Sequence, residues 1–203
     1  MNDHPGISET QKQTGRESDE QLMLAFSKGS PEAFTELFER YKQPLFGFFR
    51  RRVADPALAE ELTQEAFLAV LRAGARYQPR ALFRTYLYAI GFKIMRANRR
   101  KAAFRVAFLG RAAGSLEPGV KSACEAEVSL RHAMGKLDRI DREILLLREF
   151  EELRYAEIAD VLNLPLNTVR SRLFRARVAL RDLLAAPATN AVRPNLTESE
   201  EQA

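Results

Sequence analysis

The chain has 203 residues, of which 46% are hydrophobic and 29% charged, a balance that supports one large or two small domains with buried cores. It contains no apolar run long enough to span a bilayer and no secretory signal at its start, and its single cysteine, Cys124, excludes an internal disulfide framework, so we expect a cytoplasmic protein. The formal net charge of +5 favours an acidic partner, although many unrelated basic proteins share such a charge.

The first strong pattern predicts a helix that begins after Ser30. Ser30-Pro31-Glu32 combines an N-cap residue, a proline at the first helical position and an acid near the positive helix end. Apolar residues then recur at spacings of three and four and predict one buried stripe. These residues are Phe34, Leu37, Phe38, Tyr41, Leu45, Phe48 and Phe49. Pro44 lies within this pattern and is expected to kink or interrupt the helix.

Two further helices are predicted in the N-terminal half. Asp55-Pro56 repeats the cap signal, and the helix that follows is expected to bury Leu58, Leu62, Ala66 and Ala69. After a loop around 74–79, a third helix runs toward Arg100, with apolar positions at Phe83, Leu87, Ile90 and Ile94. No alternating strand pattern is present, so the sequence predicts an all-α fold.

The glycine- and proline-containing segment 106–124 has no sustained periodicity and is interpreted as a linker between two helical domains, 18–105 and 125–186. The ends, 1–17 and 187–203, are polar and poor in large apolar residues, so both are expected to be disordered tails.

Residues 155–184 have the pattern of a helix-turn-helix. A short helix over 157–162 is followed by Asn163, which tolerates the left-handed backbone of a tight turn, and Asn167 or Thr168 can cap the next helix. That helix is expected to bury one stripe, formed by Val169, Leu173, Ala176 and Leu180. Its opposite side presents Ser171, Phe174, Arg175 and Val178, with Arg170 on a flank.

Charge along the chain is segregated by sign. No Asp or Glu occurs between Glu65 and Glu117, or between Asp160 and Asp182, and both stretches carry several Arg or Lys residues. An amphipathic helix kept soluble by its arginines would explain the buried stripe after Val169 but not this one-sided charge. DNA binding is therefore favoured, because the second helix of such a motif enters the major groove, where Arg reads guanine with about 1–3 kcal/mol of discrimination.

Three segments together resemble a known family. AEELTQEAFLAVLR (59–72), FRTYLYAIGFKIMRANRR (83–100) and EIADVLNLPLNTVRSRLFRAR (157–177) are similar to extracytoplasmic-function (ECF) sigma factors of the sigma-70 family, in the family's order. The resemblance implies that 18–105 is sigma region 2 and 125–186 is region 4. It further implies a protein that binds promoter DNA and core RNA polymerase and catalyses nothing, with no cofactor and no metal.

The resemblance assigns two surfaces to region 2. An acidic helix would dock on the polymerase β′ clamp through Glu60, Glu61, Gln64 and Glu65, although from these residues alone a solvated acidic face is an equal explanation. The next loop and helix would open the −10 element through Tyr77, Arg80, Arg84, Tyr86, Lys93, Arg96, Asn98, Arg99 and Arg100. Tyr86 stands where relatives carry Trp, and it can equally be a core residue beside Phe83 and Leu87.

Region 4 of the family reads the −35 element with its second helix and meets the polymerase β flap with another surface. The matching positions for DNA are Asn167, Thr168, Arg170, Ser171, Arg172, Phe174 and Arg175. Asn167 replaces a common Gly, and Asp138 replaces a common Pro and can cap the helix after it. Members of this family are often held inactive by an anti-sigma factor, and the free chain is expected to be monomeric.

Two other classes of protein compete with this interpretation. A dimeric helix-turn-helix repressor or activator would explain 157–177 but not the basic half between Ala66 and Leu116, and it would normally bind a symmetric site. An enzyme is disfavoured because the chain has only two histidines, one cysteine, no phosphate-binding glycine-rich loop and no metal-ligand cluster.

Overall fold

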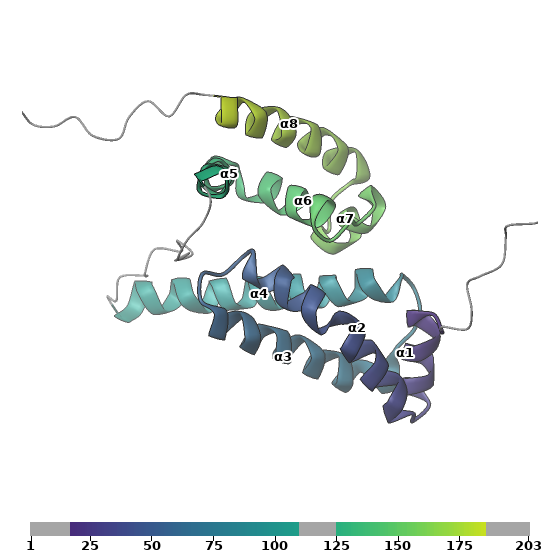
Figure 1. Ribbon diagram of the computed structural model, residues 1–203. Coiled ribbons are helices and arrows are strands. Elements are labelled where there is room, and N and C mark those ends of the chain that lie inside the picture. The colour runs from purple at the N-terminus through teal and green to yellow at the C-terminus, as the bar shows by residue number, and fades with distance from the viewer. Residues whose placement is uncertain (1–16, 110–124, 186–203) are drawn as a thin grey trace, which may run out of the picture. The chain divides into compact units, whose positions relative to one another are not determined.

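The computed structural model describes residues 17–109 and 125–185, and within these ranges all regular structure is helical (Figure 1). The described residues form two compact units, one built on α1 to α4 and one on α5, α6 and α8. The all-α prediction is therefore confirmed. Several predictions lie outside the described residues: the tail 187–203, most of the tail 1–17 and most of the predicted linker. Cys124 and His4 lie outside them as well.

The first unit contains α1 (Asp19–Ser27), α2 (Pro31–Arg50), α3 (Pro56–Ala73), the short 3-10 helix η1 (Gly74–Arg76) and α4 (Phe83–Leu109). Ser30 caps α2 by accepting the N–H of Ala33, as predicted. Pro44 does not interrupt α2, so that alternative was wrong. Leu45, Phe48 and Phe49 directly after it are fully buried, and their packing outweighs the local cost of a helical proline, about 3 kcal/mol.

The buried face of α3 is rotated relative to the predicted stripe. Asp55 caps the helix through the N–H of Ala57, at 2.9 Å. The buried residues of α3 are Ala59, Leu62, Thr63, Ala66, Phe67 and Val70. Leu62 and Ala66 were predicted correctly, whereas Leu58 and Ala69 are only half-buried. The ring of Phe67 determines this face, because it packs edge-on against the rings of Phe34 and Phe38 of α2.

Helix α4 is longer than the sequence predicted and continues past Arg100 to Leu109, so it enters the segment interpreted as linker. No glycine or proline interrupts it between Phe92 and Leu109, and its C-terminal part extends beyond α2 and α3 (Figure 1). Its N-terminal half packs closely on α2. A Cβ atom on Gly91 would lie 3.2 Å from a ring carbon of Phe48, so glycine permits this approach.

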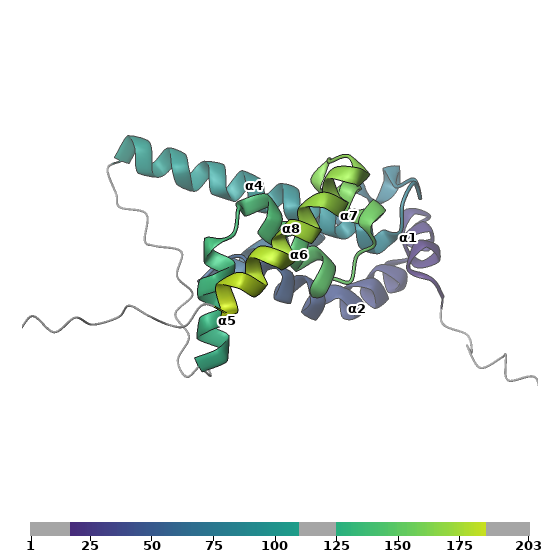
Figure 2. The same cartoon turned by 90° about the horizontal axis from the view of Figure 1, so that it is seen from above.

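The second unit contains α5 (Glu125–Lys136), α6 (Arg139–Glu149) and α8 (Leu166–Ala185), with α8 packed along α6 and beside α5 (Figure 2). Asp138 caps α6 by accepting the N–H of Ile140 at 2.9 Å, which confirms the predicted role of this replacement.

The predicted tight turn lies between α7 (Tyr155–Leu162) and α8. Asn163 adopts the expected left-handed backbone with φ of 54°, and the N–H of Leu164 bonds the carbonyl of Ala159. The predicted cap at Asn167 or Thr168 was wrong, because α8 already begins at Leu166. The carbonyl of Pro165 accepts the N–H of Val169, which makes the first helical hydrogen bond two residues earlier than expected.

Candidate nucleic-acid interface

A solvent-exposed loop, 77–82, joins η1 to α4 and carries the first predicted DNA contacts. Pro79, Arg80 and Ala81 are exposed, and the main hydrogen bonds within the loop link Gln78 to Arg80 through both backbone and side chain. Tyr77, Arg80 and Tyr86 line one open groove between the end of α3 and the start of α4. The groove therefore brings together a basic side chain and two aromatic rings that were separate predictions.

The two tyrosines in this groove form part of an aromatic cluster. The rings of Tyr77 and Tyr86 have centroids 5.4 Å apart at 65°, and Tyr86 lies 6.4 Å from the ring of Phe83. Tyr86 is half-buried, so its ring is neither fully exposed to solvent nor fully buried in the core. Burial raises the pKa of both tyrosines above the ordinary value, so their hydroxyl groups are protonated at neutral pH.

One side of α4 continues this groove as a basic face. Tyr86, Lys93 and Arg100 are spaced by seven residues, about two helical turns, and Arg96 lies beside them. Lys93, Arg96 and Arg100 are exposed. Within the residues that the structure describes, α4 contains no acid. A helix of this composition attracts a polyanion along its length.

The other predicted residues of α4 lie elsewhere. Arg84 and Arg99 are half-buried, and Arg99 has an interaction partner within the protein. Asn98 lines a second groove between α3 and the later part of α4, in which Glu61 and Glu65 also lie. Arg100 also lines this second groove, so the predicted −10 residues divide between the two grooves and the exposed basic face of α4.

Two basic residues that were not among the predicted DNA contacts, Arg72 and Arg76, also line the groove containing Tyr77 and Tyr86. Both are exposed, at the end of α3 and in η1. Both lie in the acid-free stretch after Glu65, and this was the one feature of the sequence that could have indicated a role in DNA binding. They precede the loop to which the resemblance assigned the first −10 contacts.

The predicted polymerase contacts form one exposed face of α3. Glu60, Glu61, Gln64 and Glu65 are all exposed, and none of their side chains makes a hydrogen bond or ion pair with another described residue. Leu68 and Leu71 continue the same face one and two turns later, with 47% and 40% of their surface exposed. These two leucines were also missed. Exposed leucines beside unpaired acids are typical of a protein-contact surface.

Helix α8 separates its buried and exposed residues as predicted. Val169, Leu173 and Ala176 are buried, whereas Leu180 is half-buried. The opposite side exposes Asn167, Arg170, Ser171, Phe174 and Arg175, while Thr168 is half-buried. Phe174 is 71% exposed, and the side chains of Arg170 and Arg175 have no hydrogen-bond or ion-pair partner among the described residues. These side chains are available to an external ligand.

Arg172 differs from its neighbours on α8 because its side chain forms ion pairs with other residues of the second unit. Its Nη1 atom lies 2.8 Å from Asp141 Oδ1 and 3.3 Å from Asp138 Oδ1. The hydrogen bond to Asp141 is the main cause that raises the pKa of Arg172 above its usual value. Arg172 therefore joins the start of α6 to α8, although the sequence placed it among the DNA contacts.

No group of three or more His, Cys, Asp or Glu residues in the described ranges is arranged to hold a metal ion. No helix within 17–109 or 125–185 has the length and apolar composition needed to cross a membrane.

Comparison with known families matches both halves of the chain. Residues 37–104 match the family described as Sigma-70 region 2, and residues 127–180 match Sigma-70, region 4. The RNA polymerase sigma-H factor of Pseudomonas aeruginosa is 32% identical over 179 residues, which cover 81% of this chain and 93% of that protein. RNA polymerase sigma factor CarQ of Myxococcus xanthus is 31% identical, over 80% of this chain and 95% of its own length.

A solved structure also has this fold. The structure of CnrH in complex with the cytosolic domain of CnrY matches with a TM-score of 0.63 and 26% identity, and it covers 83% of this chain and 97% of that one.

Proposed function

The chain belongs to the sigma-70 family as an ECF sigma factor that directs core RNA polymerase to promoters, and we propose which of its surfaces binds DNA and which binds the polymerase during initiation. Residues 18–105 act as region 2, which docks on the polymerase and opens the −10 element. Residues 125–186 act as region 4, which reads the −35 element.

In region 4, the exposed side of α8 enters the major groove. Arg170 and Arg175 contact base edges or phosphates, and the ring of Phe174 contacts apolar groups such as the thymine methyl. The free guanidinium groups and the 71% exposed ring support this assignment. Asn167, Thr168 and Ser171 contribute at the first turns of α8. Arg172 supports the helix from behind through its bonds to Asp141 and Asp138.

In region 2, the groove beside loop 77–82 receives the opened strand. Tyr77 and Tyr86 offer aromatic faces on which an unpaired base can stack, a contact worth about 1–3 kcal/mol per base. Arg72, Arg76 and Arg80 surround these rings and bind the backbone of the strand. The exposed Lys93, Arg96 and Arg100 extend this positive path along α4.

The polymerase contact is the exposed face of α3. Glu60, Glu61, Gln64 and Glu65 pair with a basic surface of the β′ clamp, and Leu68 and Leu71 fill apolar depressions there. Region 4 meets the β flap through a surface other than the DNA-reading side of α8. Charge complementarity of this kind sets the register and speeds the encounter.

Sigma-70 proteins act as initiation factors, and we extend this to a chain that performs no bond chemistry and needs no cofactor. Holding strands apart requires binding energy, which the basic and aromatic side chains supply. The similar CnrH structure was solved with the cytosolic domain of CnrY. By analogy, an anti-sigma factor binds this chain in the cytoplasm and keeps it from the polymerase.

One combination of features supports this proposal most strongly. Helix α4, which contains no acid, lies beside the groove tyrosines Tyr77 and Tyr86, and α8 exposes the arginines Arg170 and Arg175, whose side chains have no partner among the described residues. The test is run-off transcription with purified core polymerase on genomic fragments. Defined transcripts that depend on this chain, with footprints over two unlike elements, would support it. Tight binding to a palindrome without polymerase, and no transcripts, would contradict it.

A further inference from the structure

Helix α1 (Asp19–Ser27) precedes both segments that match the sigma-70 family, yet it contacts the elements on both sides of loop 77–82. Its own structure is well defined, because Ser18 and Gln21 form a reciprocal capping box and Leu22 and Met23 are buried. A helix held this firmly beside a functional loop can determine the position of that loop.

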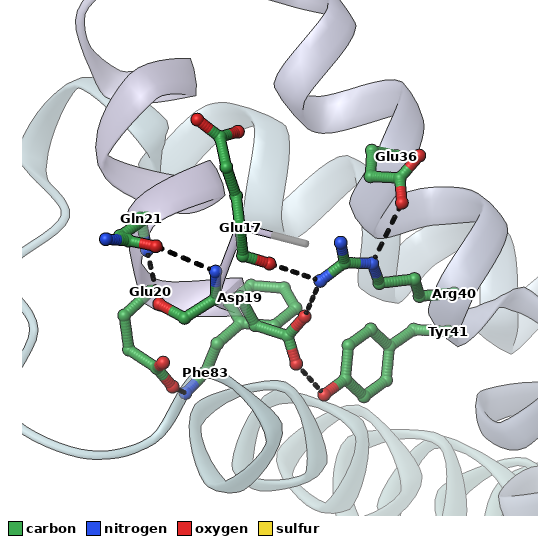
Figure 3. Close-up of polar contacts among 9 residues, drawn as sticks. Glu17, Asp19, Glu20, Gln21, Glu36, Arg40, Tyr41 and Phe83 are labelled. Atoms are coloured by element: carbon green, nitrogen blue, oxygen red, sulfur yellow. Dashed lines mark hydrogen bonds and ion pairs between the residues drawn. The ribbon is translucent and has the colours of Figure 1, made fainter. Parts of the chain in front are cut away.

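The start of α1 is fixed to α2 through Asp19 (Figure 3). One carboxylate oxygen of Asp19 lies 2.6 Å from Arg40 Nη1, and the other accepts the hydroxyl hydrogen of Tyr41. Arg40 also donates to the carbonyl of Glu17 and to the carboxylate of Glu36. Because both acceptor atoms of Asp19 are used, the first turn of α1 has a defined position on α2.

From this position α1 contacts the end of loop 77–82 (Figure 3). Glu20 Oε1 accepts the backbone N–H of Phe83, the first residue of α4, at 2.8 Å. Leu82, which precedes the helix, has no side-chain acceptor to cap it. Glu20 therefore acts as the N-cap of α4 from another helix, and its negative charge suits the positive end of the helix dipole.

The same helix contacts the start of the loop. The ring of Phe26 lies against Gly74 in η1, so closely that a Cβ atom at Gly74 would be 2.3 Å from a ring carbon. Tyr77 directly follows η1, and its N–H bonds the carbonyl of Gly74. Helix α1 thus holds both ends of a loop whose middle residues are exposed.

We propose that α1 is a positioning element for loop 77–82 and that Glu20 is the positioning residue that aligns this loop with the start of α4 for promoter opening. This inference rests on the proposed role of Tyr77, Arg80 and Tyr86 in holding the opened strand. With the Glu20 bond intact, the loop and the first turn of α4 share one arrangement. Without it, water replaces the carboxylate, the loop samples other arrangements, and only a fraction of the molecules can capture a base.

The test compares promoter opening by Glu20→Ala and wild-type protein in the polymerase holoenzyme. Permanganate reactivity of −10 thymines measures opening on a fully paired promoter, and a pre-opened bubble template measures activity once the strands are already apart. We expect Glu20→Ala to slow opening of the paired promoter about tenfold and to transcribe the bubble template within about twofold of wild type, since one charge-assisted hydrogen bond is lost.

Two variants separate positioning from a general loss of structure. Glu20→Gln keeps an oxygen acceptor for the Phe83 N–H and should restore opening to within about threefold of wild type. Gln21→Ala removes the capping-box partner of Ser18 and weakens α1 without touching Phe83, so it should open the paired promoter like wild type.

The inference is overturned if Glu20→Ala opens paired DNA at the wild-type rate, if paired and bubble templates lose activity equally, or if Gln21→Ala is as slow as Glu20→Ala. A wild-type holoenzyme that fails to open the paired promoter would instead refute the proposed function, and this result would be visible without any variant.

Discussion

The ring of Tyr77 stands edge-on to the ring of Tyr86, with centroids 5.4 Å apart and planes at 65°. Tyr77 belongs to the loop and Tyr86 to the first turn of α4, so the pair joins the loop wall and the helix wall of one groove. Edge-to-face rings leave part of each aromatic face uncovered by the other. A base that enters the groove can therefore stack on a surface that already has a fixed orientation.

Tyr86→Ala is expected to slow promoter opening by about tenfold or more, because a stacking surface worth about 1–3 kcal/mol is removed. Tyr86→Phe keeps the ring and should open the promoter within about twofold of wild type. Permanganate reactivity on a paired promoter provides the measurement. Equal defects in the two variants would show that the hydroxyl group, rather than the ring, is required.

The exposed face of α3 leads to a prediction about polymerase binding. Gln64→Ala combined with Glu65→Ala should lower affinity for core polymerase about tenfold while leaving the melting temperature unchanged, since both side chains are exposed and unpaired among the described residues. Binding is measured by fluorescence anisotropy with labelled sigma factor. Asp182→Ala, which removes an exposed acid of α8, is the matched control. Unchanged affinity in the double variant would exclude this face as the docking surface.

Arg170 and Arg172 are two residues apart on α8 but should respond differently to substitution. Arg170→Ala is expected to weaken binding to the preferred −35 sequence by about 1–3 kcal/mol and to relax selectivity there, with polymerase affinity retained. Arg172→Ala is expected to lower stability by no more than about 1 kcal/mol, because its ion pairs are partly exposed, and to leave selectivity intact.

Selection from a library of randomised −35 elements distinguishes the two variants, and urea unfolding measures the stability of each. If Arg172→Ala changes the selected sequence as strongly as Arg170→Ala, then Arg172 contacts DNA directly and must leave Asp141 to do so.

Features that depend on neighbouring residues in the sequence were predictable. The left-handed backbone at Asn163 and the cap at Asp138 follow from the local chemistry of those side chains, and both are present. The buried stripe of α8 follows from helical periodicity, and Val169, Leu173 and Ala176 confirm it. A helix also exposes whatever lies opposite its core, so the free sides of Arg170 and Arg175 could be deduced in the same way.

Features that depend on distant pairing were not predictable. Glu20 and Phe83 are 63 residues apart, and no pattern in either segment indicates that one caps the other. Arg172 and Asp141 likewise meet only after α6 and α8 have packed. The rotated face of α3 has the same origin, since Phe67 turns toward the rings of α2 and leaves Leu58 at the edge. Periodicity predicts that a helix has an apolar side, but packing against the partner helix determines which residues lie at the centre of the buried face.

The contact between Tyr41 and Asp19 predicts a pH dependence of stability. Burial, and then the hydrogen bond to Asp19, raises the pKa of Tyr41 above its ordinary value near 10. Below pH 10 the folded and unfolded chains both keep the phenol proton, and the contribution of this bond to stability is fully present. Above pH 10 the unfolded chain loses the proton first, so the unfolded state binds fewer protons and stability falls as the pH rises.

Tyr41→Phe should therefore be less stable than wild type by about 1–2 kcal/mol at pH 7, because the bond to a charged acceptor is lost. The difference should shrink steadily above pH 10, since only the wild-type protein loses this contribution there. Urea unfolding of the full chain, followed by far-ultraviolet circular dichroism between pH 7 and pH 11, provides the measurement. A stability difference that stays constant across this range would show that the phenol titrates alike in the two states, and hence that Tyr41 is not held by Asp19 in solution.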